Sequence, residues 1–339
     1  MSDPINDLAM RLLCGPIEAI PRYRLLRDVL LMSPDDRDLA DARRDITHSR
    51  LVSELAAAQH PDGSWGRFYT RNKNVRFAAR TTETALIRAN ALGLDASHPM
   101  VRQAIGYLER VLEGEAVWPD REDPTLDFPL SVQMVTAARL RQFVPDHPLA
   151  LREAYRWRDL VAVSFSEDGF DDLQYQERGE ALFGQPMPQD PRMLFSQYSL
   201  ILLRGLLPDE AEINLIRYMT GYTRGIYLIT NRSLRYKPLS FVSRETLRYI
   251  RALELLGCYR GAEDVMKDAI AWLWEQRGHD GMWDLGPAGR DGLDLPLSES
   301  WRRGQRPVDC TVRMLILLQR LKFACRLPFP PDRTEENPD

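Results

Sequence analysis

The stretch Gln59–Gly66 (QHPDGSWG) separates two helical patterns, and related residues recur further along the chain. They are found at Asp168–Phe170 (DGF) and at Gln276–Trp283 (QRGHDGMW), and the three Asp-Gly pairs lie 106 and 112 residues apart. Half of these intervals is a unit of roughly 55 residues, and the missing loops fall near Trp118-Pro119 and 221–225. Repetition at this period predicts one repeat architecture rather than two separate domains.

Each of these loops is expected to be a structural staple. The Asp side chain bonds to nearby backbone and the Gly accepts a positive φ, so the pair makes a tight turn. The Trp ring then folds back over the end of the preceding helix, where it stacks on the Gln amide and its indole N–H finds a carbonyl. A single active site would need such residues once, so their recurrence favours a structural role.

The apolar residues around these loops recur at helical spacing, as Leu25, Leu26, Val29 and Leu30 do, which predicts an all-α fold. Helices are expected near 4–14, 18–32, 36–59, 78–93, 98–113, 128–143, 147–165, 191–205, 208–220, 242–257, 259–277 and 308–324. Short and long connections alternate between them, which is typical of a chain of helical hairpins.

The helices that follow the long loops begin near 18, 78, 128, 191, 242 and 308, and we expect them to form an inner ring. Five outer helices accompany them, and helix 4–14 is available to fill the sixth outer position. Neither end carries the polar capping repeat of an open solenoid. The prediction is therefore a single-domain (α/α)6 toroid over residues 1–329, closed by helix 4–14, with a disordered acidic tail at 330–339.

Composition narrows the possible partners and location. The chain has 339 residues with 45 basic and 49 acidic side chains, a formal net charge of −4 that disfavours nucleic acid as a partner. No secretion signal or stretch of about 18 apolar residues is present in the sequence. Four cysteines without a CxxC pair are typical of reduced thiols, so a cytoplasmic protein is expected. The sequence does not indicate an oligomeric state.

Gln59–Gly66 and Gln276–Trp283 resemble the QW repeats of squalene-hopene and oxidosqualene cyclases. Thr81–Ala89 (TTETALIRA) resembles the inner helix that follows such a repeat, and the resemblance covers most of residues 36–325. Protein prenyltransferase β-subunits share the same toroid. The resemblance implies a terpenoid cyclase-like or prenyltransferase-like protein that encloses an apolar, isoprenoid-type substrate in a central cavity. It indicates the fold rather than the reaction.

The inner helices of such a ring begin at one mouth of the cavity, where their free N–H groups and positive dipole ends converge. We therefore expect the substrate to be bound there. The polar and aromatic candidates at this mouth are Arg80, Thr82, Asp127, Ser131, Tyr198, Arg244, Glu245, Trp301 and Cys310.

Class II cyclases of this kind protonate an alkene with the middle Asp of a DxDD motif, but this chain has neither DxDD nor the metal-binding DDxxD. The remaining candidate acids are Asp309 and Glu83. Burial beside aromatic walls would raise the pKa of such a carboxyl and suit it to general acid catalysis, so acid-initiated cyclisation is one hypothesis. The structural alternative for Asp309 is a helix N-cap.

Metal and diphosphate sites receive less support. Prenyltransferases that resemble this fold hold zinc with an Asp, a Cys two residues on and a distant His, whereas Asp309 and Cys310 are adjacent, so no metal or cofactor is predicted. Two sets of arginines at helical spacing would suit a diphosphate: Arg76, Arg80 and Arg88, then Arg244, Arg248 and Arg251. We favour ion pairs with Glu83, Glu245 and Glu254 instead.

Three functions remain open. The first is an enzyme acting on an isoprenoid-type substrate, which predicts a deep, mostly aromatic cavity with one unpaired carboxyl. The second is a non-catalytic toroid that binds a lipid, peptide or protein, with its cavity plugged by side chains or by a segment such as 284–306. The third is an (α/α)6 carbohydrate-active enzyme, with an open cleft and two carboxylates roughly 5 to 10 Å apart.

Overall fold

A computed structural model describes residues 3–68, 81–120 and 128–323. Over these ranges the chain is mostly helical, so the all-α expectation is confirmed. The helices are α1 (Pro4–Leu13), α2 (Ala19–Arg24) with a π-helical turn at Leu25–Val29, α3 (Arg37–Ile46), α4 (Arg50–Ala57), α5 (Thr82–Ala91), α6 (Pro99–Glu113), α7 (Phe128–Phe143), α8 (Pro148–Ser164), α9 (Asp172–Phe183), α10 (Gln197–Leu202), α11 (Asp209–Gly221), α12 (Arg244–Leu256), α13 (Ala262–Val265), α14 (Lys267–Glu275) and α15 (Arg306–Phe323). Strands β1 (Phe165–Ser166) and β2 (Gly169–Phe170) form a short hairpin, and Pro287–Gly289 is a 3-10 turn.

Several helix boundaries differ from the sequence prediction. The segment expected as one helix over 36–59 is two, because Ser49 has extended backbone and its side chain accepts the N–H of Leu51 to start α4. The helix expected over 191–205 is only the six residues of α10. The hairpin and α9 occupy residues expected to form a loop, and the side chain of Asp171 caps α9 by accepting the N–H of Gln174.

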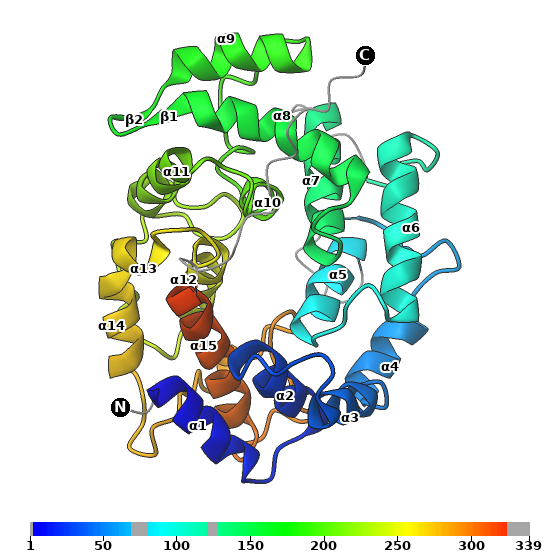
Figure 1. Ribbon diagram of the computed structural model, residues 1–339, viewed down its shortest axis with the longest axis vertical. Coiled ribbons are helices and arrows are strands. Elements are labelled where there is room, and N and C mark those ends of the chain that lie inside the picture. The colour runs from blue at the N-terminus through cyan, green and yellow to red at the C-terminus, as the bar shows by residue number, and fades with distance from the viewer. Residues whose placement is uncertain (1–2, 69–80, 121–127, 324–339) are drawn as a thin grey trace.

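Helices α2, α5, α7, α10, α12 and α15 surround the middle of the molecule in Figure 1. Polar contacts join the first of these helices in chain order. Arg24 on α2 donates to the carbonyl of Ala91 at the end of α5, and Arg139 on α7 donates to Glu83 on α5 at 2.7 Å. Arg141 on α7 then donates to the carbonyl of Leu202 on α10.

The remaining contacts continue this series and return to the start. Arg251 on α12 donates to Gln197 on α10 at 3.2 Å. Arg313 on α15 bonds to Glu254 on α12 at 2.8 Å. Finally, the Gln319 amide on α15 donates to the carbonyl of Val29, at the π-helical turn that follows α2, at 2.8 Å.

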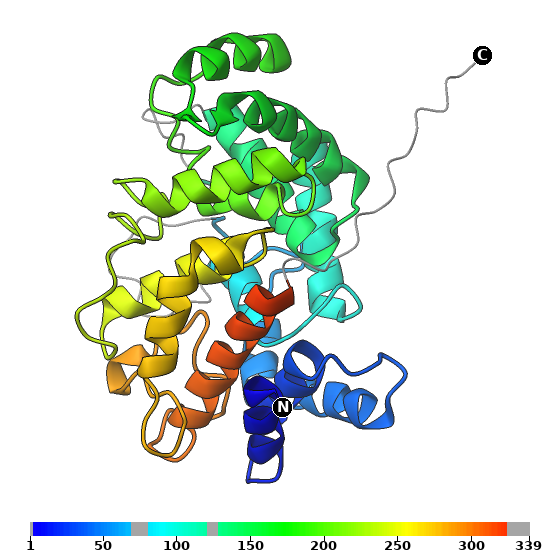
Figure 2. The ribbon, with the colours of Figure 1, turned by 60° about the vertical axis from the view of Figure 1, so that its left-hand side comes forward.

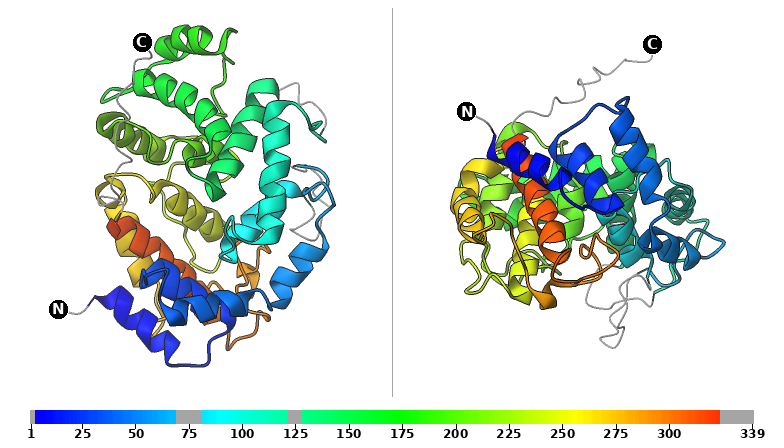
Figure 3. Two further views of the ribbon diagram at one scale, coloured as in Figure 1. Left: turned by 45° about the vertical axis from the view of Figure 1, so that its right-hand side comes forward. Right: turned by 90° about the horizontal axis from the view of Figure 1, so that it is seen from below.

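The N-terminal helix α1 packs against α15 and against the π-helical turn. Its Arg11 donates to the carbonyl of Asp280 at 2.9 Å, and Asp3 beside its start pairs with Lys322 near the end of α15. The right-hand view of Figure 3 shows α1 in dark blue beside α15 in orange-red. The expected tail at 330–339 lies outside the described residues.

Two of the three Asp-Gly loops are staples with matching contacts, as predicted. The indole N–H of Trp65 donates to the carbonyl of Leu55 at 2.9 Å, and that of Trp283 donates to Leu273 at 2.7 Å. The backbone N–H of Trp65 donates at 3.0 Å to the hydroxyl of Thr82 at the start of α5. Each loop therefore ties the end of one helix to the start of the next.

The second Trp loop repeats the detail of the first. The N–H of Trp283 donates to the hydroxyl of Thr311 at 3.0 Å, as Trp65 does to Thr82. Gly63 and Gly281 both have positive φ, of 90° and 78°. The Gln59 amide donates to the carbonyls of Gly63 and Met100, both at 2.9 Å.

The loop at Asp168-Gly169 is built differently. Gly169 has a φ of 116° and turns the chain between β1 and β2, which pair antiparallel. Phe170 then packs against Phe165, Phe195 and Tyr218, with ring centroids 5.1 to 6.1 Å apart. The shared sequence at this position thus marks a hairpin on an aromatic cluster and not a Trp staple.

Over the part of the chain that the structure describes, none of the helices is long and apolar enough to cross a bilayer.

Candidate functional site

A cavity of about 580 Å³ lies among α5, α7, α10 and α12, with segments 222–231 and 284–305 completing its wall. Its aromatic side chains are Trp118, Tyr198 and Tyr227. Aliphatic side chains are more numerous: Ile87, Val132, Val135, Leu228, Ile229, Leu247 and Leu293. The wall is therefore more aliphatic than the sequence comparison implied, and segment 284–305 lines the cavity without filling it.

Four of the predicted site residues lie in this wall, namely Glu83, Ser131, Tyr198 and Arg244. Thr82, Glu245, Trp301, Asp309 and Cys310 are not among the residues that line the cavity. Arg80 and Asp127 lie outside the described residues, as does Arg76.

Glu83 is held by two donors, one on α7 and one on α10. It sits in the first turn of α5, which Thr81 starts by accepting the N–H of Thr84 at 3.2 Å. Its Oε1 accepts from the Arg139 guanidinium and from the Tyr198 hydroxyl, both at 2.7 Å. Burial, followed by the charge of Glu83, raises the pKa of Tyr198 well above its usual value, so the phenol remains a neutral donor. Glu83 is thus arranged as an acceptor in an ion pair rather than as a proton donor.

The opposite part of the wall contains a second charged cluster. Asp294 accepts from Arg251 at 3.0 Å and from Arg313 at 3.1 Å. Arg313 also bonds to both carboxylate oxygens of Glu254, at 2.8 and 2.9 Å. Burial pushes the pKa of Asp294 up, but the guanidinium groups of Arg313 and Arg251 outweigh it and leave the pKa below its usual value.

Asp291 lines the cavity beside Asp294 and behaves differently. Its Oδ1 accepts three backbone N–H groups, from Leu293, Asp294 and Leu295, at 2.9 to 3.0 Å. Burial and the nearby charge of Asp294 raise its pKa above the usual range. Two neighbouring carboxyls whose pKa values are pushed apart are typical of an acid paired with a charged group. The sequence signal for this pair is Asp291-Gly-Leu-Asp294, in a segment that we treated only as a possible plug.

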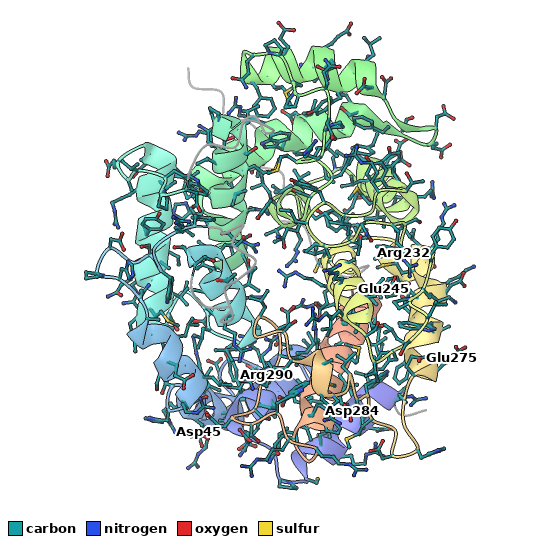
Figure 4. The ribbon with its side chains drawn as sticks, turned by 180° about the vertical axis from the view of Figure 1, so that it is seen from behind. Asp45, Arg232, Glu245, Glu275, Asp284 and Arg290 are labelled. Atoms are coloured by element: carbon teal, nitrogen blue, oxygen red, sulfur yellow. The ribbon has the colours of Figure 1, made fainter. Side chains whose placement is uncertain are left out.

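The arginines at the cavity fall into two groups. Arg251 pairs with Asp294, as does no other arginine of the wall, and the buried Arg88, which does not line the cavity, donates to the carbonyls of Leu293 and Pro296 at 3.2 and 2.5 Å. Arg244, Arg248 and Arg290 are exposed members of the wall, and within the described ranges no acidic side chain forms an ion pair with them. Figure 4 shows Arg290 on the long segment 284–305 and Glu245 beside Arg232 near the start of α12.

The expected partners of the arginines are corrected by these contacts. Glu83, Glu245 and Glu254 do form ion pairs, but with Arg139, Arg232 and Arg313. Each pair joins different elements, and the basic partners are not the arginines that the sequence singled out. Arg244 and Arg248 are left facing the cavity as a result.

Asp309 occupies neither of its two expected positions. It lies inside the first turns of α15, so it is not the N-cap, and it is fully buried away from the cavity wall. Its Oδ2 accepts the N–H groups of Leu297 and Ser298 at 2.8 and 2.9 Å, and its Oδ1 accepts the Ser298 hydroxyl at 2.5 Å. Asp309 therefore holds segment 284–305 against α15.

The other candidates outside the wall have similar structural contacts. Thr82 accepts the backbone N–H of Trp65, and Trp301 donates to the carbonyl of Pro287 at 3.0 Å. The Cys310 sulfur accepts the N–H of Leu285 at 3.5 Å, and burial raises the pKa of its thiol to about 12. These contacts fasten the loops that follow the staples.

Replacing Asp309 with Asn should change how stability depends on pH. Burial raises the pKa of Asp309 to about 6, although the bonds from Ser298 and Leu297 oppose it. An unfolded Asp titrates near about 3.9, so the native state binds more protons between these values. The contribution of Asp309 to the free energy of unfolding is therefore largest below pH ~4, and it falls by about 3 kcal/mol as pH rises through ~6.

Asp309→Asn should remove this dependence on pH. In urea unfolding at pH 4.5, 6 and 7.5, the free energy of unfolding of the variant should therefore rise relative to that of the wild type as pH rises. Asp45→Asn is the control because Asp45 is exposed (Figure 4). A wild-type-to-variant difference that is constant with pH would contradict the assignment.

Among the described residues, no group of three or more His, Cys, Asp or Glu side chains is placed to hold a metal ion. Comparisons with known proteins add no further assignment: no protein family, no curated protein and no solved structure matches this chain.

Proposed function

We propose that this protein is an (α/α)6 toroid similar to terpenoid cyclases and protein prenyltransferases, and that it encloses an isoprenoid-type substrate in its cavity. Support for the toroid comes from the cyclic series of contacts from α2 through α15 and back to Val29. The packing of α1 on α15 supports its place at the closure.

One observation carries the substrate class, namely that an apolar wall meets arginines without an ion-pair partner among the described residues in the same cavity. Ile87, Val132 and Val135 offer a surface for a hydrocarbon chain, whereas Arg244 and Arg248 lie on α12 at its edge. Guanidinium groups bind phosphate oxygens through paired, charge-assisted hydrogen bonds. The ligand that suits both features is a long hydrocarbon with an anionic head, such as a prenyl diphosphate.

Asp291 is the acid that this cavity offers for an acid-initiated reaction. Burial and the charge of Asp294 raise its pKa, although Arg313 at 3.9 Å and the backbone N–H groups oppose this, whereas the guanidinium groups of Arg313 and Arg251 lower the pKa of Asp294. A proton given to a substrate double bond would create a carbocation, and loss of a proton from the product cation would restore the acid. In this proposal Asp291 replaces Asp309 and Glu83 as the candidate acid.

Calorimetric titration with farnesyl diphosphate, farnesol and inorganic diphosphate should test the binding. Farnesyl diphosphate should bind most tightly, because it alone fills the apolar wall and reaches the arginines. Arg248→Ala should weaken its binding roughly 10- to 100-fold, as expected for loss of a hydrogen bond to a charged group. Arg217→Ala, an exposed arginine outside this cavity, should leave binding unchanged.

Equal binding of the three compounds, or equal binding by wild type and Arg248→Ala, would reject the proposed substrate class. Incubation with squalene and a panel of polyprenyl diphosphates then separates an enzyme from a binding protein. Product formed by wild type and lost in Asp291→Asn would support acid catalysis. Binding without any product from wild type would favour the non-catalytic alternative.

A further inference from the structure

The segment that leads from α11 into α12, residues 222–248, differs in charge from the rest of the chain. It contains six basic residues and one acidic residue, Glu245, in a protein whose formal net charge is −4. We refer to it as the basic segment. Figure 2 shows its yellow-green ribbon along the outer edge of the molecule.

Large apolar side chains point into solvent from the same segment. Leu239 is 100% exposed, Tyr236 is 67% exposed and Val242 is 52% exposed. Pro238 and Phe241, which alternate with them, are buried. Single exposed apolar residues are ordinary, but three within seven positions form a cluster that calls for a partner.

Hydrogen bonds attach the backbone of the basic segment to the rest of the protein, so these exposed side chains are held in place. The carbonyl of Leu234 accepts the Tyr249 hydroxyl at 3.1 Å, and its N–H donates to the carbonyl of Thr220 at 3.1 Å. The carbonyl of Ser240 accepts the hydroxyls of Thr246 and Ser243, at 2.7 and 2.9 Å. Leu239 therefore projects from a fixed turn.

Four of the six basic side chains have no ion-pair partner within the described ranges: Arg235, Lys237, Arg244 and Arg248. The other two are neutralised by neighbours, Arg224 by Asp190 and Arg232 by Glu245. All four unpaired cations are exposed, and Arg235 and Lys237 immediately flank Tyr236. Unpaired positive charge and exposed apolar side chains thus occur together in residues 235–248.

We propose that the basic segment docks the protein on the surface of an anionic lipid bilayer. Leu239, Tyr236 and Val242 would insert at the boundary between headgroups and acyl chains, while Arg235 and Lys237 would contact lipid phosphates. Shallow apolar insertion combined with basic residues is the usual arrangement of proteins that lie on a membrane without crossing it.

A bilayer suits this surface better than a folded partner protein. The apolar side chains project singly from a turn, and a bilayer accepts such projections without a matching pocket. Leu228, which is 57% exposed, and Arg248 belong both to the basic segment and to the cavity wall. Docking would therefore bring the cavity close to a lipid phase. The inference does not require the proposed function, since it concerns the surface alone.

Flotation with vesicles free of isoprenoids is the test. Wild type should float with phosphatidylcholine vesicles that contain 30% phosphatidylglycerol and not with pure phosphatidylcholine, and 0.5 M NaCl should weaken binding. Each lost cation should weaken binding about five-fold, so Arg235→Gln/Lys237→Gln should lose about 25-fold. Leu239→Ser should lose about ten-fold or more.

Two variants provide matched controls. Leu173→Ser removes a leucine that is 63% exposed on α9, and Lys267→Gln removes an exposed cation on α14, so both should bind like wild type. No flotation by wild type, or equal flotation by all variants, would overturn the proposal. So would a wild-type dimer that Leu239→Ser converts to a monomer without any vesicle binding, because the surface would then join two copies of the chain.

Discussion

Trp283→Ala should lower the free energy of unfolding by about 3–5 kcal/mol, the usual cost of removing a buried aromatic side chain. The Trp283 ring is fully buried and packs on Trp274 with ring centroids 5.4 Å apart. Its indole N–H also satisfies the carbonyl of Leu273 at 2.7 Å. The loss arises from a cavity and an unpaired carbonyl at the junction of α14 and α15.

Urea unfolding followed by circular dichroism at 222 nm would measure this loss. Trp283→Phe keeps most of the ring but leaves the Leu273 carbonyl without its donor, so it should cost about 1–3 kcal/mol. Trp301→Ala is the control because Trp301 is only partly buried and should lose less than Trp283→Ala.

Trp65→Ala should match Trp283→Ala, because Trp65 makes the equivalent contacts to Leu55 and Thr82. The two losses should add, since no residue is shared between the sites. A loss under 1 kcal/mol for either Trp would show that these loops are not staples.

Arg313→Met should cost about 3–5 kcal/mol at neutral pH, because it leaves two partly buried carboxylates without their main cation. Arg313 is only 5% exposed and bonds to Glu254 and Asp294. In wild type the net pKa of Asp294 lies below its unfolded value, so its contribution is present above pH ~4 and is lost as pH falls. Without Arg313 the pKa of Asp294 is lowered less. Protonation of this carboxylate at low pH should therefore reduce the destabilisation of the variant.

The difference in the free energy of unfolding between wild type and Arg313→Met should therefore decrease as pH falls from 7 to 4 in urea titrations. Arg44→Met is the control, since Arg44 is 75% exposed in its side chain and forms a surface pair with Asp41 that is worth about 0–1 kcal/mol. Adding Glu254→Gln to Arg313→Met should cost less than the two single losses combined, because the partners are coupled. A gap that does not change with pH would contradict this account.

Sequence periodicity located most helices well where local capping agreed with it. The expected helix over 128–143 matches α7, and 98–113 differs from α6 by one residue. It was wrong where one side chain stopped the helix, as Ser49 does between α3 and α4. It also gave no warning that Asp168-Gly169 forms a hairpin, because Asp-Gly favours a tight turn without specifying what flanks it.

The candidate site was only partly predictable for a different reason. Glu83, Ser131, Tyr198 and Arg244, which the sequence places near the expected starts of inner helices, line the cavity. Asp309 satisfied the same rule, yet its side chain turns toward Ser298 instead. A position along a helix does not specify which neighbour a side chain meets when a long loop crosses the helix.

The sequence by itself determined the all-α class and the two Trp staples, since turn chemistry and helix spacing act between residues close in the chain. Only the tertiary structure decided which acids are neutralised and which arginines have no ion-pair partner within the described ranges. Glu83 meets Arg139 from 56 residues away and Glu254 meets Arg313 from 59 residues away. Such pairs depend on how helices pack, and packing follows from the burial of the whole apolar surface rather than from any short stretch of sequence.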